Sequence, residues 1–372
     1  MSIHLPEEVI NSILLKLPVI SLLKLRCVCK KWLKLFSDPN FIEMHHKHTI
    51  ERNIWSLMLL VETSEFSTQK NRLYSVEFRT PSPSSSSLTT YYEDVGIDLP
   101  RCSIPNYEWV GVMESCDGLI YLRYEAGHVC LFNPFTREFK EIQLPVLVAD
   151  DYDFSIYGFG YDSKINDFKI VDISVTCEER GEALGPNSWT SIEKVLPVHD
   201  DDMDGEGVFV NGALHWLTTS CILAFDIEDE TFQELPQRVF GTERGICVLG
   251  GCLCISSRKD NVSFEVWVMN EYGIGESWSK FFAISSPTFE KWTYFKPIHS
   301  FENGLILLRV GDSLVSYYPK HRTARTLEFQ GIPAWANLTT LFGNLVSLNS
   351  GTYMRSQEQT EDGAEYINGI PF

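Results

Sequence analysis

Apolar residues in the first fifty positions recur at the spacing of amphipathic α-helices. The first stripe consists of Val9, Ile10, Ile13, Leu14 and Leu17. A second stripe runs through residues 21–36, with Ser21 in an N-cap position, and a third, shorter one begins at Asp38-Pro39. The pattern predicts a head of three helices within residues 5–48.

Two leucines lie off these stripes. Leu15 is opposite the first stripe, and Leu23 lies on the basic side of the second, with Arg26, Lys30 and Lys34. About 45 residues are also too few to bury the apolar surface of three helices without help. Either these leucines pack on the rest of the chain, or the head is half of an interface that an acidic partner protein completes.

From about residue 54 the helical spacing gives way to short alternating strands, glycine turns and frequent aromatic residues, which predict all-β structure. One half-unit, a Gly turn followed by alternating apolar positions, recurs at residues 116–122, 211–217, 250–255 and 303–308. Another, a hairpin, recurs at residues 131–145, 224–236 and 316–327. Paired half-units of about forty residues are typical of propeller blades.

These patterns predict a fold that is α+β and mostly β. We expect a helical head at residues 1–50, a degenerate β-propeller of six or seven blades at 54–350 and a flexible tail at 351–372. A two-sheet sandwich is the competing architecture, but the repeated turn chemistry favours radial repetition. Segments 55–61 and 338–348 are both strand-like, so one can close the ring against the other.

Composition restricts the class of protein. The chain of 372 residues is 44% hydrophobic, and it has no apolar run long enough to cross a membrane. Its first residues lack the pattern of a signal peptide. Its ten cysteines include no CxxC pair, which fits a reduced compartment. We therefore expect a cytoplasmic or nuclear protein.

The net charge of −19 is unevenly distributed. Residues 1–52 contain eight basic and five acidic residues, a net charge of +3, so the rest of the chain carries −22. An acidic body repels nucleic acid and favours a basic protein surface as its partner.

Three features bear on possible chemistry. His45, His46 and His48 have no Cys or carboxylate at a metal-ligand spacing, so we expect a solvated helix face rather than a metal site. The acidic run 199–206 lacks the later oxygen ligands of a calcium loop. No Gly-rich phosphate loop and no G-x-S-x-G elbow occurs, and we expect no catalytic residue, no cofactor and no metal.

The apolar positions of the head also follow a specific order: LPEEVI at 5–10, IL at 13–14, LP at 17–18, SL at 21–22, LRCVCK at 25–30 and Trp32. This order resembles an F-box over residues 3–45. The resemblance implies binding of a Skp-family adaptor, which links to a cullin and a RING subunit. The contacts that it implies, some of which must instead hold the helices together, are Leu5, Pro6, Ile10, Leu14, Leu17, Pro18, Leu22, Leu25, Val28 and Trp32.

Segments of the body add a second resemblance. They are NPFTR at 133–137, YGFGYD at 157–162, NDFKIV at 166–171 and FEVWVM at 264–269. Their order resembles that of plant F-box-associated, kelch-like domains. Together the two resemblances imply a non-catalytic substrate receptor of an SCF-type E3 ubiquitin ligase, whose propeller holds an unidentified target protein for ubiquitination.

Target contacts are expected on loops between blades, because loops carry specificity on a rigid scaffold. The candidates are Asp200, Asp201, Asp202, Asp204, Glu178 and Glu179. Two alternatives remain open. One is a propeller that binds a small ligand or a glycan, and the other is an F-box protein that acts outside the ligase.

Overall fold

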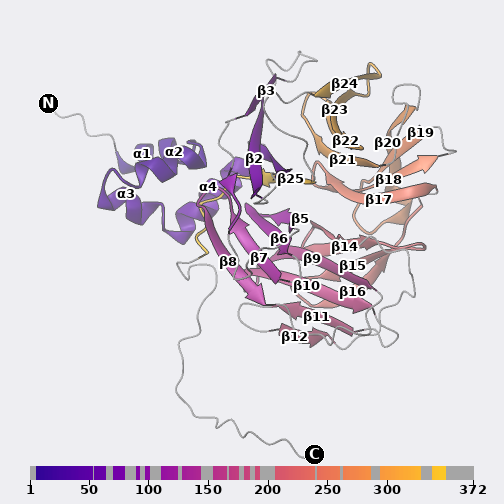
Figure 1. Cartoon of the computed structure of the whole chain (residues 1–372), viewed down its shortest axis with the longest axis horizontal. Coiled ribbons are helices and arrows are strands. Elements are labelled where there is room, and N and C mark those ends of the chain that lie inside the picture. Colours follow the sequence, from indigo (N-terminus) through magenta and orange to yellow (C-terminus); the bar gives the residue numbers. More distant parts are fainter. Residues whose placement is uncertain are drawn as a thin grey trace, which may run out of the picture.

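A computed structural model of the chain describes residues 6–52, 54–63, 70–79, 89–92, 97–100, 110–124, 128–143, 154–165, 167–175, 180–184, 189–192, 206–238, 241–259, 263–285, 294–327 and 337–348. Within these residues, four α-helices come first, and the later elements are strands apart from one short 3-10 turn (Gly275–Ser277). Figure 1 shows the helices at one side of the sheets. No helix of the described part is long and apolar enough to cross a membrane.

The head contains four helices rather than the three predicted. They are α1 (Glu7–Leu14), α2 (Val19–Leu25), α3 (Lys30–Leu35) and α4 (Pro39–Glu51). The predicted second helix is divided, because Cys29 is extended, with φ at −157°, and precedes α3 as its N-cap. Helix α2 begins before Ser21, so the predicted cap is wrong. Asp38 caps α4 as expected, since its carboxylate accepts two backbone N–H groups of the first turn.

The described residues of the body form six sheets of antiparallel strands. Five have four strands each: β5–β8 (Val110–Cys116, Leu119–Tyr124, His128–Asn133, Glu138–Gln143), β9–β12 (Phe154–Asp162, Asp167–Val175, Arg180–Leu184, Trp189–Ile192), β13–β16 (Val208–Val210, Ala213–Leu217, Ile222–Asp226, Thr231–Leu235), β17–β20 (Thr242–Leu249, Cys252–Lys259, Ser263–Met269, Trp278–Ser285) and β21–β24 (Phe295–Ser300, Ile306–Val310, Ser313–Tyr318, Thr323–Leu327). The sixth combines β1 (Trp55–Thr63), β2 (Lys70–Arg79), β3 (Thr89–Tyr92) and β4 (Ile97–Asp98) with the last strand, β25 (Asn337–Phe342).

The sheets form a closed propeller. One edge strand of each sheet contacts that of the next around a ring, in the order β25, β5, β9, β13, β17, β21 and back to β25. Strand β25 pairs with β1, from Trp55 opposite Phe342 to Leu60 opposite Asn337. The C-terminal strand therefore completes the blade that the N-terminal strands begin. This confirms the propeller and its predicted closure, and six sheets lie within the predicted range of blades.

The repeated half-units occupy fixed places in the blades. The Gly turns join the first two strands of a sheet, as at Asp117-Gly118 between β5 and β6, where φ is 45° and 86°. The equivalent turn between β13 and β14, Asn211-Gly212, has φ of 53° and 77°. Two successive positive φ angles form a hairpin turn that matches the twist of the strands, and Asn, Asp and Gly adopt them most easily. The repeated hairpins join the last two strands.

Candidate interaction surfaces of the head and the propeller

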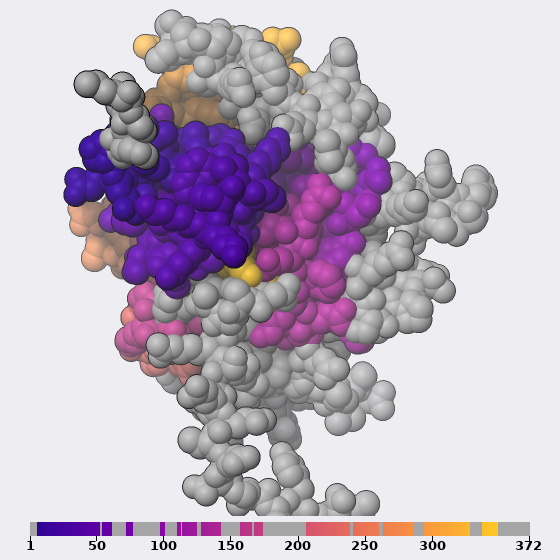
Figure 2. Space-filling model, turned by 90° about the vertical axis from the view of Figure 1, so that its left-hand side faces the viewer, coloured from indigo at the N-terminus to yellow at the C-terminus, as the bar shows by residue number. Residues whose placement is uncertain are grey.

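An apolar core joins the head to the propeller. Buried side chains of the head, among them Leu22, Phe36 and Phe41, form one cluster with Leu119 on β6 and with Val346. Figure 2 shows the helices, in indigo, lying over the propeller beside the segment after β25, in yellow. This joint fixes the orientation of the head relative to the propeller.

Two histidines of α4 make polar contacts, one within the head and one across the joint. His45 Nε2 lies 2.8 Å from the carbonyl oxygen of Leu17, and His46 Nε2 lies 3.2 Å from the carboxylate of Asp117 in the propeller. His45 is only 2% exposed, and burial lowers its pKa below the usual 6.5. The predicted solvated helix face is therefore wrong for His45. Across the described ranges, no group of His, Cys, Asp and Glu is placed to hold a metal ion.

The structure separates the predicted adaptor contacts by their exposure. Leu14 and Leu22 are buried, at 3% and 0% exposure, and belong to the core of the joint. Half-buried side chains that pack against this core are Ile10, Leu17, Leu25 and Trp32. Exposed side chains are Pro6, Pro18 and Val28. Leu5 lies outside the described residues.

Sequence reasoning missed much of the apolar surface that the head exposes. Val9 and Ile13, both assigned to the first stripe, are 43% and 49% exposed, because α1 carries apolar residues on two faces. The other exposed apolar side chains of the helices and their connections are Ile20, Val28, Leu33, Met44 and Ile50. Exposed lysines on α2 and α3 are Lys24, Lys30, Lys31 and Lys34. A surface that is both apolar and basic suits an acidic protein partner.

Leu15 and Leu23, which lie off the predicted stripes, are partly buried against the core that the head shares with the propeller. Packing within the chain therefore accounts for these two leucines. The apolar surface that the head exposes comes from other residues.

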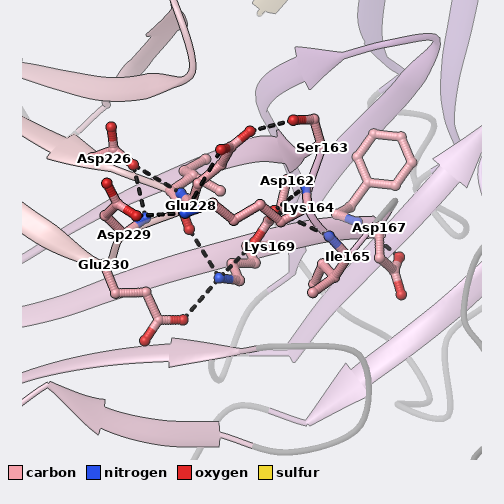
Figure 3. A network of polar contacts seen from close by, with 12 residues as sticks. Asp162, Ser163, Lys164, Ile165, Asp167, Lys169, Asp226, Glu228, Asp229 and Glu230 are labelled. Atoms are coloured by element: carbon pink, nitrogen blue, oxygen red, sulfur yellow. Dashed lines mark hydrogen bonds and ion pairs between the residues drawn. The ribbon is translucent and has the colours of Figure 1, made fainter.

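The segment around residues 157–171 ties two blades together, as Figure 3 shows. Lys169 on β10 forms an ion pair of 2.8 Å with Asp162 on β9. Its Nζ also donates to the carbonyl oxygen of Ile227, 2.9 Å away, and lies 2.8 Å from the Glu230 carboxylate, both between β15 and β16. Close approach of the blades also favours glycine at position 160, because a Cβ atom there would lie too close to Cδ1 of Ile227, and one of the two would have to move. The residues of this motif thus have a structural role.

The predicted target-binding residues, Asp200, Asp201, Asp202, Asp204, Glu178 and Glu179, all lie outside the described residues and stay a prediction. The last residue of the same acidic run, Glu206, is described. Its carboxylate lies 3.3 Å from Lys296 Nζ in a cavity at the centre of the propeller.

Two known domains match this architecture. The F-box domain matches residues 3–44, and the F-box associated beta propeller domain matches residues 64–323, which is more than half of the chain. The chain belongs to the F-box proteins with an associated propeller. An F-box joined to a propeller is, in general, the architecture of a substrate receptor of an SCF-type ubiquitin ligase, in which the F-box binds a Skp-type adaptor.

This F-box protein is similar to plant proteins along most of its length. It is 28% identical to F-box protein CPR1 of Arabidopsis thaliana, in an alignment that covers 96% of this chain and 93% of that protein. An F-box/kelch-repeat protein of the same plant is 29% identical, over 84% of this chain and 87% of that protein. The predicted resemblance to plant F-box proteins is confirmed.

Proposed function

We propose that this F-box protein is the substrate-recognition subunit of an SCF-type E3 ubiquitin ligase in the cytoplasm or nucleus. The head binds a Skp-family adaptor and, through it, a cullin and a RING subunit. The propeller captures a target protein, which the other subunits ubiquitinate. The chain contributes proximity rather than catalysis.

The exposed apolar surface of the head carries this proposal. Val9 and Ile13 on α1, Ile20 on α2 and Val28 in the following turn are between 39% and 62% exposed. Covering such side chains releases free energy of about 25 cal/mol per Å² of apolar surface, which a partner gains on binding. We assign Leu14 and Leu22 to the core and these exposed residues to the adaptor contact.

The joint between head and propeller supports the second step. Its buried core holds the propeller in a fixed position relative to the head. A target held by the propeller therefore keeps a defined distance from the adaptor, which raises its effective concentration at the ubiquitin-carrying subunit.

Co-purification of the full chain with a plant Skp-family adaptor tests the proposal. The informative variant is Ile13→Glu/Val28→Glu, and Ile274→Glu is the matched control, because Ile274 is 46% exposed on the propeller. We expect the wild type and the control to form a stoichiometric complex and the double variant to lose it at an unchanged melting temperature. Absence of a wild-type complex, or equal binding by the double variant, overturns the assignment. Charged substitutions at Leu14 or Leu22 cannot serve, because a buried charge unfolds the head.

A further inference from the structure

A cavity lies at the centre of the propeller. Its volume is about 380 Å³, and residues on or beside β5, β13, β17, β21, β22 and β25 line it. Small-molecule sites are concavities of about 300–1,000 Å³, so the cavity has the size of a ligand site. It shares no lining residue with the head or with the Asp162–Lys169 pair.

One wall of the cavity holds an acid whose pKa is raised. The two carboxyl oxygens of Glu114 on β5 accept the backbone N–H groups of Phe159 on β9, at 3.2 Å, and of Phe209 on β13, at 3.1 Å. Loss of hydration raises the pKa of Glu114 to about 8. The two hydrogen bonds and Lys296 oppose this rise, whereas the charge of Glu206 adds to it.

Another part of the lining supplies two cations. Lys296 on β21 lies 3.3 Å from the carboxylate of Glu206. Arg309 on β22 lies with its guanidinium 5.1 Å from the ring centroid of Tyr294, and its Nε donates to the carbonyl oxygen of Gly311 at 3.2 Å. Among the described lining residues, Lys296 and Arg309 carry positive charges and Glu206 a negative one, and the raised pKa of Glu114 disfavours a second negative charge. In a chain of net charge −19, this positive excess gives the cavity a preference for anions that the surrounding protein lacks.

We propose that the central cavity binds a small organic monocarboxylate, whose carboxylate lies at Lys296 and Arg309 and whose apolar part contacts Phe209 and Val248. A guanidinium held over an aromatic ring presents its planar donors to a planar carboxylate. The ionised carboxylate of Glu206 repels a second negative charge, which favours a monoanion over a dicarboxylate or a phosphate. Binding in the cavity does not depend on the adaptor or on the proposed ligase function.

Calorimetric titration and thermal unfolding of the full chain at pH 7 test the proposal, with benzoate and cinnamate each beside its neutral amide. The acid and amide of a pair have nearly the same size and apolar surface and differ in charge. We expect at least one acid to bind and to raise the melting temperature, because a ligand of the folded state stabilises it, and its amide to do neither. The proposal fails if neither acid binds at millimolar concentration or if acid and amide bind equally.

Variants of the full chain locate the site. Lys296→Met and Arg309→Met are each expected to weaken acid binding by about tenfold or more, because each removes one charge-assisted contact. Arg238→Met is the matched control, since Arg238 pairs with Glu276 outside the cavity and its side chain is 58% exposed. Circular dichroism verifies folding, and if Arg309→Met does not fold, Lys296→Met decides the question. Unchanged binding by the folded cavity variants places the acid elsewhere and overturns the proposal.

Discussion

Val19 in α2 lies directly against Gly343, the residue after β25, so that a Cβ atom on Gly343 would be 2.9 Å from Cγ2 of Val19. This contact joins the head to the strand that closes the propeller. Neighbouring atoms do not approach a Cβ atom so closely, so a methyl group at position 343 has to displace the Val19 side chain, the helix or the closing strand.

The Gly343→Ala variant is therefore expected to lose about 1–3 kcal/mol of unfolding free energy, the usual cost of overpacking. In a Val19→Ala background, where Cγ2 is absent, the same substitution should cost much less. Urea unfolding of the wild type, the two single variants and the double variant measures this coupling. Additive effects of the two substitutions would show that the contact does not govern the joint.

Lys169 and Lys164 provide a matched pair for testing the tie between blades. The Lys169 side chain is 8% exposed and is paired with Asp162, which is 2% exposed, whereas Lys164 is 53% exposed and is paired with Asp229, which is 67% exposed. Lys169→Met leaves a buried carboxylate unpaired and is expected to cost about 3–5 kcal/mol. Lys164→Met should cost less than about 1 kcal/mol. Equal losses in urea unfolding of the two variants would contradict the structural role of the buried pair.

The blade pattern was predictable from sequence because its signals are local. Asp117-Gly118 and Asn211-Gly212 adopt positive φ angles that few other residue types tolerate, so the turns mark the strands on both sides. The closure of the propeller ring by β25 was predictable because the sequence is strand-like at both ends of the body. Membership of the F-box family followed from the order of residues in the head.

Local signals of this kind predicted neither which apolar residues of the head are exposed nor the central cavity. Apolar residues such as Val9 and Leu14 have the same chemistry, and only the position of the propeller decides which of them is covered. The division of α2 from α3 was missed because no Pro or Gly interrupts residues 26–29. Glu114 and Lys296 are far apart in sequence, and the ring alone brings them to one cavity.

Glu114 should make the stability of the propeller depend on pH. Its pKa is about 8 in the folded chain, against a usual 4.5, so the folded state favours the protonated acid. This contribution is fully present below pH 4.5 and is lost as the pH rises from there to about 8, by up to about 4 kcal/mol. A Glu114→Gln variant keeps Glu206 and Lys296, the groups that face position 114 in the cavity. It loses only the carboxyl group that titrates.

Urea unfolding of the wild type and of Glu114→Gln at pH 6 and pH 9 isolates the effect. Any fixed cost of placing an amide beside the two backbone N–H groups is the same at both pH values. We expect the stability of the variant relative to the wild type to rise between pH 6 and pH 9. A constant difference would show that Glu114 is already ionised at pH 6.

His45 should give the head the opposite pH dependence. Burial is the main reason that its pKa lies below 6.5, and the charges of His46 and His48 lower it further, against the hydrogen bond to Leu17. Its Nδ1 is buried and has no hydrogen-bond partner among the described residues, so protonation there creates an N–H group that none of them satisfies. A lowered folded-state pKa means that the stabilisation is fully present above pH 6.5 and is lost as the pH falls below that value through the lowered pKa of the folded state. A His45→Phe variant keeps a ring against Phe41 but cannot titrate. Compared with this variant, the wild type should lose more unfolding free energy between pH 7.5 and pH 5. Equal losses would show that His45 does not contribute to the pH dependence of the head.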